Sequence, residues 1–207
     1  MQWRFFCREE SRGCALMKLL DEILSANVQF RQNLPKDYSD EDVKKSKLPN
    51  RHLAIITCMD TRLVEFLEPA LGIRRGEAKI IKTAGNGVTG MFDGTIRSLL
   101  VCVFELGVRE VMVIGHQECG MAHASSKELM DNMKKRGISG DAIRMIQPEL
   151  EKWVDDFHHP VQNIEDTVWQ IRMNPLIPQN IPVHGLLFHP RTGEVNTIVD
   201  GYEELDK

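Results

Sequence analysis

The sequence predicts a single α/β domain built on a central, mostly parallel β-sheet that is flanked by helices. Three short apolar runs carry this prediction, because they are rich in Ile and Val and do not alternate with polar residues. Such runs are typical of strands that are covered on both faces. Helical patterns separate them, and this order indicates a parallel sheet with right-handed crossovers. The three runs are residues 52–57, 78–83 and 111–115.

Before the first strand, the chain divides into a leader and a helix. Residues 1–16 mix arginines and glutamates, and we interpret them as a disordered or incidental N-terminal extension. Leu and Ile recur at helical spacing over residues 16–28, which predicts an amphipathic helix. The charged stretch that follows has a proline near each end and is typical of a surface connection. We therefore expect one domain over residues 17–207.

After the first strand, helical patterns occupy much of the chain. One helix is expected from the run "LVEFLEPALG", and another from the apolar face between Ile96 and Phe104. Three further stretches are predicted to be mostly helical, residues 121–135, 141–157 and 161–173. The end of the chain predicts a β-hairpin, because two apolar runs flank the turn "HPRTGE". These two runs are residues 183–188 and 195–201.

Composition argues against several classes of function. The net charge of −4, the scattered basic residues and the few aromatic residues do not favour a nucleic-acid surface. No apolar stretch approaches the roughly 20 residues that span a bilayer, so we expect no membrane partner. The N-terminal residues lack the apolar segment of a signal peptide, which favours a cytoplasmic protein.

The cysteines favour metal binding over disulfide bonds. Their number is five, an odd count at irregular spacing, which does not indicate a disulfide framework. Cys7 and Cys14 lie in the leader, and Cys102 lies within a predicted helix, so we expect incidental or packing roles for them. Cys58 and Cys119, in contrast, follow the first and third strands.

Three potential zinc ligands follow two strands of the predicted sheet. Cys58 comes directly after the first strand, and His116 and Cys119 form a His-x-x-Cys motif after the third. In a parallel sheet, ligands collect at the carboxyl ends of the strands. Two cysteines and one histidine are a known ligand set for catalytic zinc, with the fourth position left for another group. A single cysteine or histidine at a strand end is explained more simply as a core residue or a hydrogen-bonded one. The combination of three such residues predicts Zn²⁺ at this edge of the sheet.

Asp60 and Arg62 share the turn that begins with Cys58. A guanidinium beside a carboxylate keeps the carboxylate ionised, and a bidentate contact would also fix its orientation. We expect Asp60 to accept a hydrogen bond from metal-bound water and Arg62 to hold Asp60. The alternative is a surface ion pair, which contributes little.

The glycine-rich run "GNGVTG" offers a different interpretation. It matches G-x-G-x-x-G and lies between a predicted strand and a helix, as a dinucleotide-binding loop requires. However, it follows the second strand, its helix begins late, and the acidic Glu118 lies much further on than the expected distance of about 20 residues. We favour a tight loop in which the backbone of Gly85 approaches the metal pocket.

The two motifs C-x-D-x-R and H-x-x-C-G, at residues 58–62 and 116–120, together resemble the zinc signature of the β-class carbonic anhydrases, especially their compact prokaryotic branch. The resemblance runs from about residue 21 to residue 201. It departs from the family at Lys82 and Thr83, where many members read Arg-Asn, near the expected substrate entry.

The resemblance implies a zinc lyase, a carbonate dehydratase that converts carbon dioxide reversibly to bicarbonate and a proton by attack of zinc-bound hydroxide. It also implies a homodimer, or an assembly of dimers, in which the N-terminal helix extends to the partner subunit. Hydrolysis of carbonyl sulfide or carbon disulfide is an alternative within the family. A non-catalytic zinc module is another, with Asp60 as fourth ligand, and the sequence leaves open whether Asp60 binds zinc or orients its water. His123, one helical turn past Cys119, is a candidate proton shuttle or an ordinary surface histidine.

Overall fold

The computed structural model describes residues 18–35, 38, 46–157, 159–203 and 205. The predicted N-terminal extension, residues 1–16, therefore lies outside the described residues. The chain divides between residues 45 and 46 into two compact units, which are described one at a time. The single domain expected over residues 17–207 stays a prediction.

The described part of the first unit is chiefly helix α1, Leu19–Gln32. Its apolar stripe agrees with the predicted amphipathic helix, which ends a turn later than expected. The helix has no buried residue, and five apolar side chains of the stripe are between 50% and 70% exposed: Leu19, Leu20, Ile23, Leu24 and Val28. These side chains make α1 a helix whose apolar face needs a partner surface.

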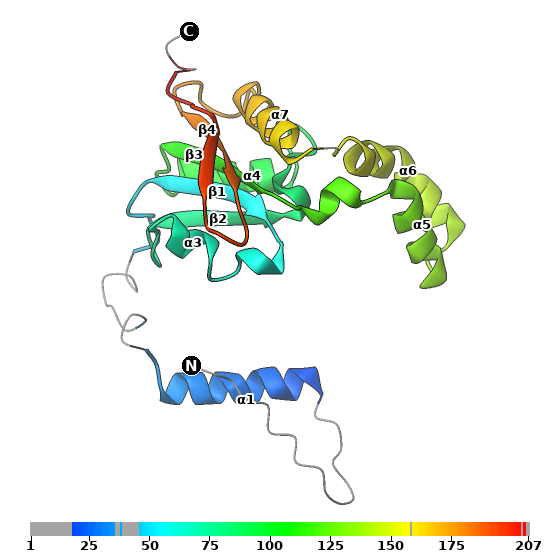
Figure 1. Cartoon of the computed structure of the whole chain (residues 1–207), viewed down its shortest axis with the longest axis horizontal. Helices are drawn as coiled ribbons and strands as arrows, with labels where there is room; N and C mark the ends of the chain where they lie inside the picture. The colour runs from blue at the N-terminus through cyan, green and yellow to red at the C-terminus, as the bar shows by residue number, and fades with distance from the viewer. Residues whose placement is uncertain (1–17, 36–37, 39–45, 158, 204, 206–207) are drawn as a thin grey trace, which may run out of the picture. The chain divides into compact units, whose positions relative to one another are not determined.

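The second unit is built on a five-stranded sheet with the strand order β2-β1-β3-β4-β5 (Figure 1). The first four strands in this order run parallel to one another, and β5 pairs antiparallel with β4. This confirms the predicted α/β class, with its mostly parallel sheet and C-terminal hairpin. The strands are β1 Leu53–Cys58, β2 Ala78–Thr83, β3 Glu110–His116, β4 Val183–Phe188 and β5 Val195–Val199.

The two faces of the sheet are covered by different elements. On β1, Ala54 and Ile56 belong to a core cluster with residues of α4 (Gly94–Phe104) and α7 (Pro160–Arg172). The intervening Ile55 belongs to a second cluster with Leu63 and Leu67. Alternate residues of a strand point to opposite faces, so this division explains why the run is continuously apolar.

The region directly after β1 is less helical than the sequence predicts. In place of one helix, a 3₁₀ turn η2 (Thr61–Leu63) and a short helix α3 (Leu67–Ala70) are present. Between them, Glu65 adopts a left-handed backbone conformation with φ of 55°. A single α-helix cannot continue through such a residue, so the predicted helix is broken there.

The remaining helices agree closely with the predicted stretches. A 3₁₀ turn η4 (Gly120–His123) precedes α5 (Ser126–Lys135), and α6 (Gly140–Asp155) runs beside α5 (Figure 1). A second short turn, η3 (Ala84–Asn86), follows β2. None of the helices in the described ranges is both long enough and apolar enough to cross a membrane.

Candidate metal centre

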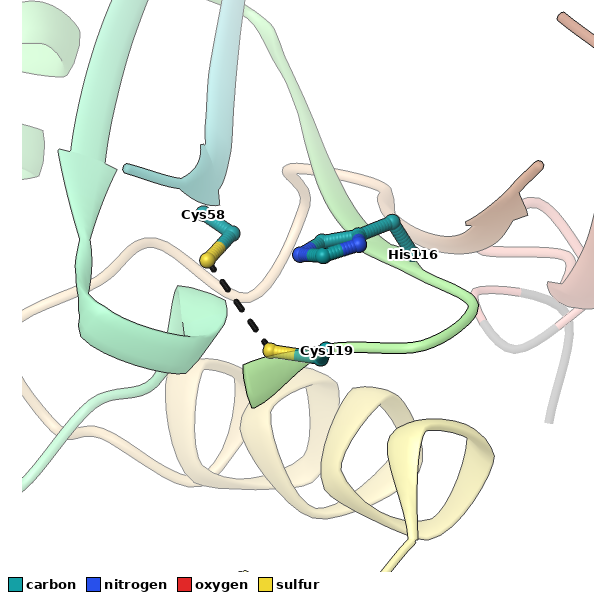
Figure 2. A group of neighbouring side chains, drawn as sticks. All are labelled: Cys58, His116 and Cys119. Atoms are coloured by element: carbon teal, nitrogen blue, oxygen red, sulfur yellow. Dashed lines mark hydrogen bonds between the residues drawn. The ribbon is translucent and has the colours of Figure 1, made fainter. Parts of the chain in front are cut away.

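Three side chains converge at the carboxyl end of the sheet. Cys58 ends β1, His116 ends β3, and Cys119 immediately precedes η4. Strands β1 and β3 are parallel neighbours, so their ends lie at the same edge. The ligand atoms of the three residues lie within 4.8 Å of one another, all three residues are buried, and the two sulfur atoms are 3.9 Å apart (Figure 2). This group could hold a metal ion.

The imidazole of His116 is oriented for such a role. Its Nδ1 lies 2.9 Å from the backbone oxygen of Gln117, so this nitrogen carries the proton and donates it. In the described part of the chain, the Nε2 atom is buried and makes no well-aligned hydrogen bond, and it carries a lone pair when the ring is neutral. Burial, the largest single influence, works to lower the pKa of His116, but its interactions with Cys58, Gln117 and Asp60 together raise that pKa. A buried nitrogen beside two sulfur atoms fits zinc.

The two thiols ionise as a pair. A hydrogen bond from Cys119 lowers the pKa of Cys58 to about 4, against the effect of burial, and His116 and the backbone of Gly85 and Asp60 lower it further. The same hydrogen bond, together with burial, raises the pKa of Cys119. The two buried sulfur atoms share one hydrogen bond, and the lowered pKa of Cys58 favours its thiolate form. A pre-formed thiolate is the form of cysteine that binds metals.

Asp60 and Arg62 form a bidentate pair beside the cluster. Arg62 donates from Nε to Asp60 Oδ1 at 3.0 Å and from Nη2 to Oδ2 at 2.8 Å. Its backbone N–H also donates to Oδ1 at 2.8 Å. These contacts lower the pKa of Asp60 to about 2, although burial works in the opposite direction. Asp60 Oδ2 lies 3.8 Å from His116 Nε2, so a charged carboxylate faces the cluster without belonging to it.

Two residues that contact the Asp60–Arg62 pair, directly or through a neighbour, were not predicted from the sequence. Arg62 donates from Nη2 to the backbone oxygen of Glu118 at 2.8 Å, and its Nη1 lies 3.4 Å from the Glu118 carboxylate. Arg191, from the turn between β4 and β5, pairs with the same carboxylate. The sequence suggested Glu118 only as a ribose ligand. Arg191 is 73 residues away from it, and no sequence pattern connects the two.

The loop after β2 approaches Cys58 through Gly85. This residue is buried and left-handed, with φ of 73°. An added Cβ would lie 2.8 Å from Phe157 and 3.2 Å from Met121, so only glycine fits without displacement of its neighbours. The backbone of Gly85 is close enough to the Cys58 sulfur to lower the pKa of that thiol.

The same loop does not have the geometry of a dinucleotide-binding loop. Asp93 caps helix α4 by accepting from the backbone N–H of Ile96 at 2.8 Å. Its second carboxylate oxygen accepts from the backbone N–H of Thr89 at 2.6 Å. A carboxylate thus occupies the helix N-terminus where a pyrophosphate would have to bind.

The residues where the sequence departs from the family lie next to Cys58. Thr83 pairs with Cys58 across β1 and β2, and its hydroxyl is buried without a hydrogen-bond partner in the described part of the chain. Lys82 extends to Glu68, with 3.5 Å between Nζ and Oε1. His123, on η4, is exposed.

The sheet and the buried Cys-His-Cys group define an α/β protein with a candidate metal site at the carboxyl edge of its sheet. A family model for carbonic anhydrase matches residues 53–195. The chain is 43% identical to YtiB of Bacillus subtilis, over 90% of this chain and 99% of that protein. It is 34% identical to a carbon disulfide hydrolase of Acidithiobacillus thiooxidans, over 70% of this chain and 76% of the hydrolase.

Solved structures agree with these relatives. The crystal structure of β-carbonic anhydrase isoform I from Trichomonas vaginalis superimposes with a TM-score of 0.82 at 49% identity, covering 90% of this chain and 100% of that one. The chain therefore belongs to the β-carbonic anhydrase family. The predicted family and enzyme class, a carbonate dehydratase, are confirmed by these matches.

Proposed function

We propose that this protein is a zinc-dependent carbonic anhydrase that interconverts carbon dioxide and bicarbonate with release of a proton. The observation that carries the proposal is the convergence of the buried His116 Nε2 atom and two buried sulfur atoms, which lie within 4.8 Å of one another, in a chain of this family. Each of the three side chains offers one ligand atom, and neither thiol is paired in a disulfide.

Cys58, His116 and Cys119 would hold Zn²⁺. The bound ion would supply a nucleophile from water near neutral pH. The protein favours metal binding, because the pKa of Cys58 is lowered and the Gln117 carbonyl sets the His116 tautomer. The pKa of Cys119 is raised, so its thiol would give up a proton when the ion binds.

Asp60 would orient the reacting water. Its carboxylate stays ionised because of Arg62, so it accepts a hydrogen bond and does not donate one. Both of its oxygens are engaged by Arg62, which favours this role over that of a fourth metal ligand. The backbone of Gly85 would line the substrate pocket, and the exposed His123 could carry the proton from the site to solvent.

Carbon disulfide is the second candidate substrate. A relative at 34% identity is named for its hydrolysis, and the same zinc chemistry would serve both linear molecules. The side chains at Lys82 and Thr83 differ from the common family residues, which bears on substrate preference.

A stopped-flow assay of carbon dioxide hydration, on protein of measured zinc content, tests the proposal. One zinc per chain, with activity that is lost together with zinc in Cys58→Ser, is the expected result. Cys102→Ser serves as the matched control, because this buried thiol lies in α4 and should leave zinc binding unchanged. Full zinc without hydration, but with release of hydrogen sulfide from carbon disulfide, would favour the second substrate.

We also propose a homodimer in the cytoplasm. The exposed apolar stripe of α1 supports an interface with a second copy, since burial of such side chains stabilises association. Sedimentation of the wild type beside Ile23→Asp with Leu24→Asp tests this assembly; a monomer is expected for the variant.

A further inference from the structure

A side chain from α7 holds the loop that reaches Cys58. Asn163, in the first turn of α7, donates from Nδ2 to the backbone oxygen of Gly85 at 2.7 Å. The two residues are 78 positions apart in the sequence. This is a short hydrogen bond to a partly buried carbonyl, and it ties a helix to a turn beside the metal cluster.

The backbone groups and the Cα atom of Gly85 each have a close neighbour. Its turn, η3, lies against the end of β1, its backbone is close enough to the sulfur of Cys58 to lower the pKa of that thiol, and its carbonyl accepts from Asn163. Its Cα faces Phe157 and Met121, which leave no room for a side chain. Gly85 adopts a left-handed backbone conformation. If its φ and ψ angles changed, its backbone would turn away from the sulfur of Cys58.

We propose that Asn163 is a positioning residue of the metal centre, which keeps the backbone of Gly85 beside the Cys58 sulfur by anchoring the carbonyl of the same residue. The inference rests on the proposed zinc site. A hydrogen bond to a ligating thiolate fixes its direction and its donor strength. Loss of such an outer contact typically weakens metal binding by about 10- to 100-fold.

Asn174 provides a matched control. It follows α7 directly, and its Nδ2 donates to the backbone oxygen of Met91 at 2.9 Å. The donor, the acceptor and the distance are similar to those of Asn163, but Met91 is six residues beyond Gly85 and makes no contact with Cys58 that the structure records. A purely structural effect should therefore be common to both asparagines.

The experiment compares the wild type, Asn163→Asp, Asn163→Ala and Asn174→Asp in the full chain. Zinc affinity is measured by competition with a chromophoric chelator, and the thiolate-to-metal absorption is recorded after loading with Co²⁺. Both Asn163 variants should bind zinc about tenfold more weakly and shift the cobalt absorption. Asn174→Asp should lower the melting temperature and leave both metal readouts unchanged. Asn163→Ala removes the donor without added charge, and it covers the case in which the aspartate variant does not fold.

Unchanged zinc affinity and cobalt absorption in the Asn163 variants would overturn the inference. Equal changes in Asn174→Asp would overturn it as well, because the effect would then be general destabilisation. Neither metal readout depends on catalysis. If the wild type bound zinc but did not hydrate carbon dioxide, the proposed activity would be wrong. The two metal readouts would still test the role of Asn163.

Discussion

Two buried histidines lie at opposite ends of the sheet, His116 at the end of β3 and His184 near the start of β4. His184 is surrounded by protein groups on both ring nitrogens. Its Nδ1 accepts from the backbone N–H of Gly201 at 3.1 Å, and its Nε2 lies 3.3 Å from a carboxylate oxygen of Glu110, although poorly aligned for a hydrogen bond. The ring also packs edge-on against Tyr202.

The two sites differ in whether the polar atoms around the imidazole ring face one common point. Around His116, two sulfur atoms and one nitrogen face a common point. Around His184, the polar partners lie on opposite nitrogens, so they cannot share one ion. A buried histidine near acidic residues is therefore insufficient to indicate a metal site. The ring nitrogen must also face other donor atoms that converge with it on one point.

Replacement of His116 should have the largest effect. His116→Gln removes one of three ligands, so we expect zinc content to fall to near zero and hydration activity to disappear with it. Zinc analysis and stopped-flow hydration measure this outcome. If His184→Gln lost zinc to the same extent, the contrast between the two histidines would be wrong.

Asp60→Asn should separate metal binding from catalysis. The amide keeps the shape of the side chain but loses the charge held by Arg62, so zinc should be retained while kcat falls about 100-fold, as for a lost proton acceptor. A fully active Asp60→Asn would disprove the proposed role of the carboxylate.

His184→Gln should affect stability alone. The buried ring contacts Gly201, Glu110 and Tyr202, and its loss leaves polar groups without partners, at a cost of about 2 kcal/mol in the free energy of unfolding. Denaturant unfolding of zinc-loaded protein measures this, and zinc content is the control that should not change.

The smallest effect concerns the acid stability of the Asp60–Arg62 pair. The pKa of Asp60 is lowered from 3.8 to about 2 in the folded protein. The pair therefore stabilises the fold above about pH 4 and loses this contribution as the pH falls towards 2. Arg62→Ala should lower stability by about 1 kcal/mol near neutral pH, since the guanidinium is 41% exposed and screened by solvent.

Below the pKa of Asp60, the difference in stability between the wild type and Arg62→Ala should shrink to what Arg62 contributes through Glu118. Urea unfolding of the metal-free proteins at several pH values tests the sign of this dependence. A difference that grows with acidification would contradict it.

The sequence alone predicted the strands and the convergence of Cys58, His116 and Cys119 well, for related reasons. Strands covered on both faces produce continuous apolar runs, and β1 begins one residue later than the predicted run while β2 matches it. Cys58 and His116 come directly after two of those runs, so their convergence could be expected from the parallel order of the strands. The helix after β1 was mispredicted because its apolar spacing does not reveal the left-handed Glu65. The contacts of Glu118 with Arg191 and of Gly85 with Asn163 join distant segments, and no local pattern encodes them.

The spacing of Cys58 and Cys119 in the chain has a consequence for the lifetime of the fold, if both bind zinc as proposed. Cys58 and Cys119 are 61 residues apart, and β2, η3 and α4 lie between them in the chain. A zinc ion shared by both sulfurs would close this segment into a ring and restrict the unfolded chain as a covalent cross-link does. Unlike a disulfide, the ring would open when a chelator removes the ion, without any reductant. Metal supply would then govern how long the protein survives proteases as well as how fast it works.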